Sequence, residues 1–125
     1  MSVIVTGLQE LVASFEQAPL RLRVLAATAV EVTARRVRDD ARQRISGHRY
    51  LPRYPHSITY DIKATARGVE AEIGPDKGRP QGPLGNIIEY GTSKNAPLPH
   101  LGPALDAAEA DAEHGITTAV RDALL

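Results

Sequence analysis

The feature that most constrains the fold of this chain is one long apolar stripe between residues 19 and 45. Its members recur at steps of three or four positions, which places them on one face of an α-helix. They are Leu22, Ala26, Val30, Ala34, Val37, Ala41 and Ile45. The small alanines let this face approach a sheet or another helix closely, and Ser46-Gly47 forms a normal helix stop. The sequence therefore predicts a long helix that needs a second layer.

A period of two follows this helix and predicts an antiparallel hairpin with one buried face. Apolar residues alternate with polar ones in two runs on either side of a turn at residues 65–68. They are Ile58, Tyr60, Ile62, Ala64, Val69, Ala71 and Ile73. Residues 2–6 and 87–90 are further predicted strands, so we expect an antiparallel sheet of three or four strands.

Two more helices are predicted towards the ends of the chain. Leu8, Leu11, Val12 and Phe15 fall at i, i+3, i+4 and i+7, with Thr6 as the cap. The last helix follows Leu101, Leu105, Ala108, Ala112, Ile116, Ala119 or Val120, and Leu124. The predicted fold is α+β, in which the long helix packs on a small antiparallel sheet and the C-terminal helix lies beside it. A chain of 125 residues makes this one domain, residues 1–125.

The composition limits both the core and the chemistry. With 4% aromatic residues and no Trp, the core must be built from Val, Ile, Leu and Ala, and oligomerisation would add burial to so thin a core. The absence of Cys excludes disulfides, thiolate metal sites and Cys nucleophiles, and it fits assembly in a reducing cytoplasm. No signal peptide is expected in residues 1–7, and no apolar run approaches the roughly 20 residues of a membrane span. We therefore expect a soluble protein with no membrane partner.

Three segments are expected to be flexible or to need a partner. Residues 46–57 are rich in rings and arginines. Residues 75–85 hold six Gly or Pro among eleven, which predicts a long exposed loop without regular structure. Residues 93–99 form an arm that Pro97 and Pro99 hold extended.

Charge is segregated along the chain although its formal sum is +0. Residues 20–53 carry nine Arg against three acids, whereas residues 102–125 carry five acids against one Arg. One interpretation is two solvated helix faces that pair within one molecule. The other is that copies pack head to tail, the basic helix of one against the acidic helix of the next, and close into a ring.

No residue pattern predicts catalysis or a bound metal. The four histidines, His48, His56, His100 and His114, show no ligand spacing. Residues 74–78 lack the ending of a phosphate loop, and Ser57 and Ser93 stand in no nucleophile motif. The acids of the long helix, Glu31, Asp39 and Asp40, lie among arginines and predict local ion pairs. We expect a protein that is not an enzyme and that has no cofactor and no metal.

The segment from Asn86 to Leu105 predicts a strand, a sharp turn, the arm and a helix start. Gly91 permits a positive φ, and Pro103 suits the first turn of a helix. Thr92 is expected to bond the local backbone, and Glu89 is expected to face solvent from the strand. This is geometry that positions an arm and a terminal helix against neighbours.

The segment resembles the neck and tail-completion proteins of siphoviral bacteriophages. In that family a glutamate-aromatic-glycine-threonine run, here residues 89–92, precedes a proline-rich arm and a leucine-x-proline-alanine-leucine helix start, here residues 101–105. Residues 5–11 resemble the family's opening strand, turn and first helix, and Ser57-Ile58 resembles its entry into the first sheet strand. The matching pieces occur in the same order along nearly the whole chain.

The resemblance implies a structural virion protein whose copies form a ring, expected to be a hexamer, at the junction between capsid connector and tail. The ring would complete the tail around the DNA channel after assembly in the host bacterial cytoplasm. Its expected partners are itself, connector or head-closure proteins, and tail terminator or tail tube proteins, with DNA in the channel. A tail terminator or a head-closure ring is the alternative in this class. The chain departs from the family at His100, where an aromatic is common, and at Gly102, where an arginine is common.

The predicted contacts lie in the loops, the motif and the arm. The predicted ring interface comprises Arg49, Tyr50, Arg53, Tyr54, Glu89, Tyr90, Gly91, Thr92, Pro97, Pro99, Leu101 and Pro103. The alternative of another class is a small DNA-binding module, whose predicted contacts are Arg35, Arg38, Arg42, Arg49 and Arg53. Because Tyr and Arg are also enriched in protein interfaces, we prefer interface contact for the loop residues.

Overall fold

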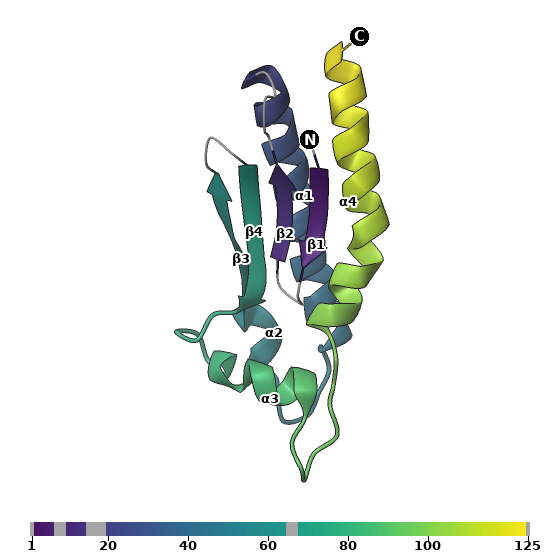
Figure 1. The fold of residues 1–125 in the computed structure, drawn as a ribbon. Helices are drawn as coiled ribbons and strands as arrows, with labels where there is room; N and C mark the ends of the chain where they lie inside the picture. Colours follow the sequence, from purple (N-terminus) through teal and green to yellow (C-terminus); the bar gives the residue numbers. More distant parts are fainter. Residues whose placement is uncertain (1, 7–9, 15–19, 65–67, 125) are drawn as a thin grey trace.

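The protein is a four-stranded antiparallel sheet with two long helices packed against it (Figure 1). The computed structural model describes residues 2–6, 10–14, 20–64 and 68–124, and of residues 2–22 and several near the C-terminal end it describes only the backbone. The strand order is β1-β2-β4-β3. The strands are β1 (Ser2–Thr6), β2 (Glu10–Ser14), β3 (Ile58–Ala64) and β4 (Gly68–Pro75). The predicted α+β architecture is therefore confirmed.

The long helix α1 (Leu20–Arg44) forms the spine of the molecule. It packs against β2, β3 and β4, while α4 (Leu101–Leu124) runs antiparallel beside it and also contacts β1 (Figure 1). The predicted α1 stripe is buried from residue 26 onward at Ala26, Val30, Ala34, Val37, Ala41 and Ile45. The side chain of Leu22 lies outside the described part of the chain.

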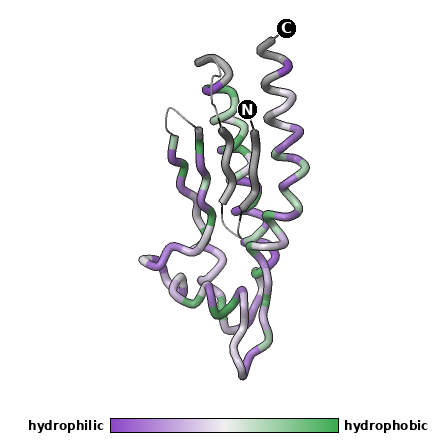
Figure 2. Tube along the Cα trace, viewed as in Figure 1, coloured by the Kyte–Doolittle hydropathy of each residue, from purple (hydrophilic) through white to green (hydrophobic). Residues whose placement is uncertain are grey.

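The sheet and α4 complete the core on either side of this stripe. Val69, Ala71 and Ile73 are fully buried on β4, while Glu70 and Glu72 between them are exposed, as the alternation predicts. Leu101, Leu105, Ala108 and Ala112 are buried on α4. Small buried residues on α1 and α4 let the two helices and the sheet approach one another closely. Figure 2 shows hydrophobic and hydrophilic residues interleaved along both helices, as expected of helices with one buried face.

The predicted helix over residues 8–15 is wrong, because residues 10–14 form strand β2. Five residues are too few to separate a helical period from strand alternation. Antiparallel pairing decides the outcome, because β2 lies between β1 and β4 and finds backbone partners on both sides. Residues 7–9 and 15–19 lie outside the described part of the chain, and so do residues 65–67 of the predicted hairpin turn.

The predicted strand over residues 87–90 is also wrong, because residues 85–90 form the short helix α3 (Gly85–Tyr90). Two successive residues, Ile88 and Glu89, are buried at 7% and 5% exposure, whereas Ile87 and Tyr90 are exposed. A strand turns successive side chains to opposite faces and would separate residues 88 and 89. The helix ends at Gly91, whose φ of 74° has the positive sign that the sequence predicts.

The two predicted loops contain short regular segments. Residues 46–57 end in α2 (Tyr54–Ser57), and residues 75–85 contain a 3₁₀ turn, η1 (Gly82–Leu84). The amide of Asp76 donates to the carbonyl of Ser57 at 2.7 Å, which ties the second loop to the first. These loops lie below the sheet, together with α3 and the arm (Figure 1).

We predict that Ala34→Leu destabilises the protein by about 1–3 kcal/mol, because Ala34 has no exposed surface in the α1 stripe and a larger side chain must displace its neighbours. Urea unfolding measures the free energy. Val32→Leu is the matched control, since Val32 is 42% exposed on the same helix and its substitution is expected to change stability by less than about 0.5 kcal/mol. Equal effects of the two substitutions would contradict the packing described here.

Candidate interaction surface

Glu89 caps the N-terminus of α4 from a distance in sequence. Its carboxylate accepts hydrogen bonds from the backbone amides of His100 at 3.1 Å, Leu101 at 2.8 Å and Gly102 at 3.4 Å. The first amides of a helix have no partner inside the helix, and a negative charge there is favourable. The prediction that Glu89 faces solvent is therefore corrected, because the carboxylate is 5% exposed and is held by these amides.

His100 links this cap to α2. Its Nδ1 lies 2.9 Å from the carbonyl oxygen of Leu98 and 3.1 Å from Glu89 Oε1, and its Nε2 lies 2.7 Å from the hydroxyl of Tyr54. Because a carbonyl only accepts, we assign the proton to Nδ1, and in the neutral ring Nε2 accepts from Tyr54. Burial raises the pKa of Tyr54, and the charge of Glu89 raises it further.

The Glu89–His100–Tyr54 network is buried and fully bonded. His100 and Tyr54 have no exposed surface, and their rings meet edge to face with centroids 5.2 Å apart. Within the described part of the chain, every buried side-chain nitrogen and oxygen has a hydrogen-bond partner. Such a network fixes α2, α3 and the start of α4 relative to one another.

The arm, residues 93–99, forms a closed turn together with the two residues before it, and this turn is held at both ends. The amide of Thr92 donates to the carbonyl of Asn95 at 2.9 Å, and Thr92 Oγ1 accepts from the amide of Asn95 at 3.1 Å. The amide of Leu98 donates to the carbonyl of Ile88 at 2.8 Å and returns the arm to α3. A Cβ at Gly91 would lie 2.7 Å from the Asn95 carbonyl oxygen, so the turn requires glycine there.

Exposed apolar side chains gather on and beside α3. Leu84 and Leu98 are each 39% exposed, Ile87 is 49% exposed and Tyr90 is 62% exposed. We call these four residues the end surface. Exposed apolar residues concentrated in one short segment are typical of a contact with another protein. The spacing of Leu84, Ile87 and Tyr90 at i, i+3 and i+6 would have shown this surface if the segment had been taken as helical.

The structure divides the predicted interface residues into a buried and an exposed group. Tyr54, Glu89 and Leu101 are buried at 0%, 5% and 2% exposure, so they support the surface from inside and do not form it. The exposed group comprises Arg49, Tyr50, Arg53, Tyr90, Thr92, Pro97 and Pro99, with Gly91 and Pro103 partly buried. The predicted arm therefore does lie on the surface, on a base that the buried group builds.

The helix arginines predicted to contact DNA make ion pairs, hydrogen bonds or ring contacts within the chain. Arg35 pairs with Glu31, and Arg38 pairs with Asp39 at 2.8 Å and lies over the ring of Tyr60. Arg42 donates twice to the Ile58 carbonyl, at 2.9 and 2.6 Å, and burial lowers its pKa. Arg38 and Arg42 are partly buried, whereas the pair of Arg35 with Glu31 at 3.5 Å is about half exposed and neutralises Arg35 weakly. Arg35 and the two loop arginines, Arg49 and Arg53, are therefore the more available members of the predicted set. Arg49 lies over the ring of Tyr50.

A hydrogen-bonded clip joins the two loops. The side chain of Gln81 accepts from the amide of Arg53 at 2.8 Å and donates to the carbonyl of Tyr50 at 3.1 Å. Gln81 has a φ of 64°, a left-handed conformation that costs free energy outside glycine. Gln81 could not be identified from the sequence, because nothing in its neighbours signals a contact with residues about 30 positions earlier.

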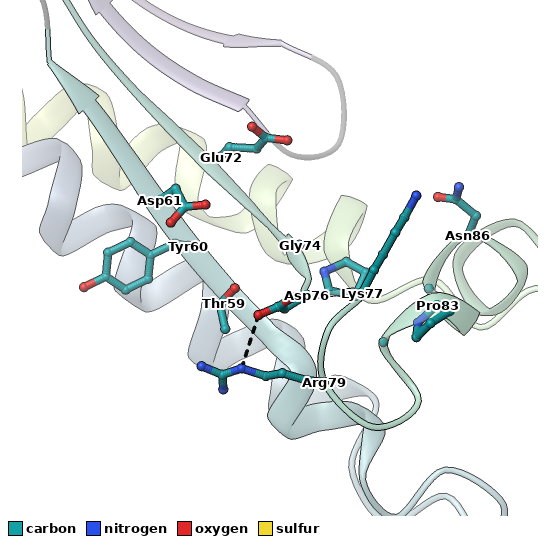
Figure 3. A pocket seen from close by; sticks show the side chains of 13 residues that line it. Thr59, Tyr60, Asp61, Glu72, Gly74, Asp76, Lys77, Arg79, Pro83 and Asn86 are labelled. Carbon is teal, nitrogen blue, oxygen red and sulfur yellow. Dashed lines mark ion pairs between the residues drawn. The ribbon is translucent and has the colours of Figure 1, made fainter.

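A polar cleft of about 650 Å³ lies between the ends of β3 and β4 and residues 75–86 (Figure 3). Asp61 and Glu72 are direct partners across the two strands, and like charges in this position destabilise a sheet. Asp76 pairs with Arg79 at 3.5 Å. Pockets that hold small molecules are mostly apolar, so this charged cleft is better suited to polar groups of a partner.

Among the described residues, no three His, Asp or Glu side chains gather so as to hold a metal ion. None of the helices in the described ranges combines the length and apolar character needed to cross a bilayer. The chain matches no protein-family model, no curated protein and no solved structure.

We predict that Glu89→Gln destabilises the protein by about 1.5–3 kcal/mol, because the amides at the start of α4 lose a charged acceptor. Chemical denaturation measures the change. The control is Glu70→Gln, which makes the same chemical change on the exposed face of β4 and is expected to have little effect. A loss no greater than that of the control would contradict the capping role.

We predict that stability falls above pH 10 partly through Tyr54. The pKa of Tyr54 is raised in the folded protein above its ordinary value of 10.0, so its contribution is full below pH 10 and declines as rising pH ionises the unfolded chain first. Tyr54→Phe should remove up to about 1.4 kcal/mol per pH unit from the slope of unfolding free energy against pH in that range. Tyr90→Phe, at an exposed position, is the control and should keep the slope. Parallel slopes for wild type and Tyr54→Phe would contradict the burial of this hydroxyl.

Proposed function

We propose that this chain is a structural virion protein that forms a ring, expected to be a hexamer, at the head-tail junction of a siphoviral bacteriophage. The ring completes the tail and joins it to the capsid connector around the DNA channel. Its partners are other copies of the chain, connector or head-closure proteins on one side, and tail terminator or tail tube proteins on the other. It assembles in the host bacterial cytoplasm.

The observation that carries the proposal is the fixed arm beside the end surface. The residues of the family-like motif do structural work here: Glu89 caps α4, Gly91 permits the turn and Thr92 closes it. They hold an exposed arm that returns to α3, the helix that carries Ile87 and Tyr90 of the end surface, through the amide of Leu98 and the carbonyl of Ile88. In this small chain the motif residues position an arm and do not form a reactive site, which suits a protein that functions by assembly.

The form of the core supports the same proposal. Many of its buried positions are alanine, and the end surface leaves Ile87 and Tyr90 about half or more exposed. Covering such side chains in a contact between copies adds apolar burial, at roughly 25 cal/mol per Å² removed from water. Oligomerisation then stabilises each copy in proportion to the concentration of its partners.

The DNA-binding alternative receives less support. Two of its five predicted contacts, Arg38 and Arg42, are partly buried and already bonded inside the chain. Arg49 and Arg53 are exposed in the loop below the sheet, where they fit a protein contact as well as a phosphate. A tail terminator or head-closure ring differs from the proposed ring only in its neighbours, and binding assays with those neighbours separate the three.

We predict that the double variant Ile87→Ser and Tyr90→Ser lowers the mass of the oligomer, measured by light scattering, to that of the 13.5 kDa monomer, because it removes apolar contact area from the end surface. The matched control is Val24→Ser with Val32→Ser, which removes two exposed apolar side chains from α1. Circular dichroism confirms that both variants fold. A wild-type chain that stays monomeric at every concentration and with its neighbouring proteins present would overturn the ring.

A further inference from the structure

We propose that the basic pocket between α2 and the turn at residues 79–81 receives carboxylates from the exposed face of α4 of a second copy of this chain. The inference rests on the proposed ring and names the two surfaces that meet in it. One surface is the pocket, lined by Arg53, His56, Ser57, Arg79 and Pro80, with a volume of about 350 Å³. The other is the acidic stripe of α4, formed by Asp106, Glu109 and Glu113.

The pocket carries an excess of positive charge. Two arginines and a histidine are among its lining residues, none of which is a carboxylate, although most of the accessible lining is apolar. Arg79 has Asp76 as its ion-pair partner at 3.5 Å, with both side chains about half exposed, so the pair neutralises it weakly. The guanidinium of Arg53 makes no ion pair with any residue of the described ranges. An anion that enters the pocket therefore meets donors with unused capacity.

The pocket is also held in shape before any partner arrives. The Gln81 clip fixes Arg53 against the second loop, with the amide of Arg53 2.8 Å from Gln81 Oε1. Arg79 Nη1 donates to the carbonyl of His56 at 3.1 Å, which places the guanidinium against α2. The backbone of Arg53 and the side chain of Arg79 are thereby held in place, and groups that are already ordered lose less entropy when they bind.

The acidic stripe of α4 carries negative charges that lack positive partners within the described part of the chain. Asp106, Glu109 and Glu113 lie at i, i+3 and i+7 and therefore share one face of the helix, and all three are exposed. Within the described part of the chain they have no ion-pair partner. The acids of α1 differ, because Glu31, Asp39 and Asp40 each pair with an arginine of the same helix. The acids of α1 thus have arginine partners inside one molecule, whereas these three acids of α4 do not.

The two surfaces belong to opposite edges of the subunit. The strand order β1-β2-β4-β3 makes β1 and β3 the two edges, and α4 packs along the β1 side while α2 packs on β3 and β4 (Figure 1). A head-to-tail contact joins two different patches of each copy, and a ring closes when the rotation from one copy to the next returns to the first copy. The carboxylates Asp61 and Glu72 belong to β3 and β4, on the same side as the pocket, so they are less suited to reach a neighbour's pocket.

Charge reversal tests the contact. We expect Arg53→Glu with Arg79→Glu to reduce the mass of the oligomer to the monomer value, and Asp106→Lys with Glu109→Lys to do the same. Combining all four substitutions in one chain should restore the oligomer, because every interface then carries the reversed pair. Arg36→Glu with Lys63→Glu, which changes net charge equally outside the pocket, is the control for the arginine pair and should leave the mass unchanged. Circular dichroism checks that each variant is folded.

Disulfide trapping tests the contact even when association is weak, because the chain has no Cys of its own. Arg53→Cys and Glu109→Cys variants are mixed and oxidised, and a covalent dimer of the two is expected. The control mixture is Arg36→Cys with Glu109→Cys, which should give little product. Equal yields from the two mixtures would overturn the inference.

The outcomes separate this inference from the proposed function. An oligomer that the end-surface variant dissociates, but that neither charge reversal nor disulfide trapping links to the pocket, overturns the inference and leaves the ring standing. A pocket reversal that lowers affinity for duplex DNA in a salt-dependent manner, without changing the mass, assigns the pocket to phosphate and also overturns the inference. Restoration by the fourfold variant together with specific trapping supports it.

Discussion

The carboxylate of Glu89 is the interaction on which the lower half of this structure depends. It comes from a short helix that does not touch solvent on that side, and it supplies the acceptor that the first amides of α4 lack. A buried charge is costly when it stands alone, but here backbone amides and the ring of His100 surround it. The position of α4 is thereby set by α3 and not only by its packing on α1.

This arrangement divides the molecule into a closely packed core and a lower part whose surface is exposed to partners. The sheet, α1 and α4 form the packed part, with alanines at the closest approaches. The loops, α3 and the arm are presented below it, and they are fixed by specific hydrogen bonds, such as those of Thr92 and Gln81, more than by apolar burial. A surface built in this way keeps its shape while leaving apolar and charged side chains exposed for partners.

The long elements and the short strand at residues 2–6 could be predicted from the sequence, whereas the structures of residues 10–14 and 85–90 could not. The α1 stripe and the β3–β4 alternation persist over enough residues to exclude the other period, and the structure agrees with both. Residues 10–14 and 85–90 are shorter than that, and their structures are decided by pairing with β1 and β4 and by the burial of Ile88 and Glu89. The Glu89–His100–Tyr54 network is harder still to predict from the sequence, because Tyr54 and His100 are 46 positions apart. His100 was identified as a departure from the family, but its contacts became visible only with the fold.

The strand order has a consequence for how the chain folds. The two outer pairs, β1 with β2 and β3 with β4, are formed between neighbours in sequence, whereas the central pairing joins residues 10–14 to residues 68–72. Closing that pairing has the larger entropic cost, so it is expected to follow the two hairpins. Until it closes, each hairpin exposes an unpaired inner edge. The β1–β2 hairpin of one copy then finds the same β4 edge in its own chain and in any other copy. We therefore expect domain swapping to be the main misfolding route of this topology at high concentration.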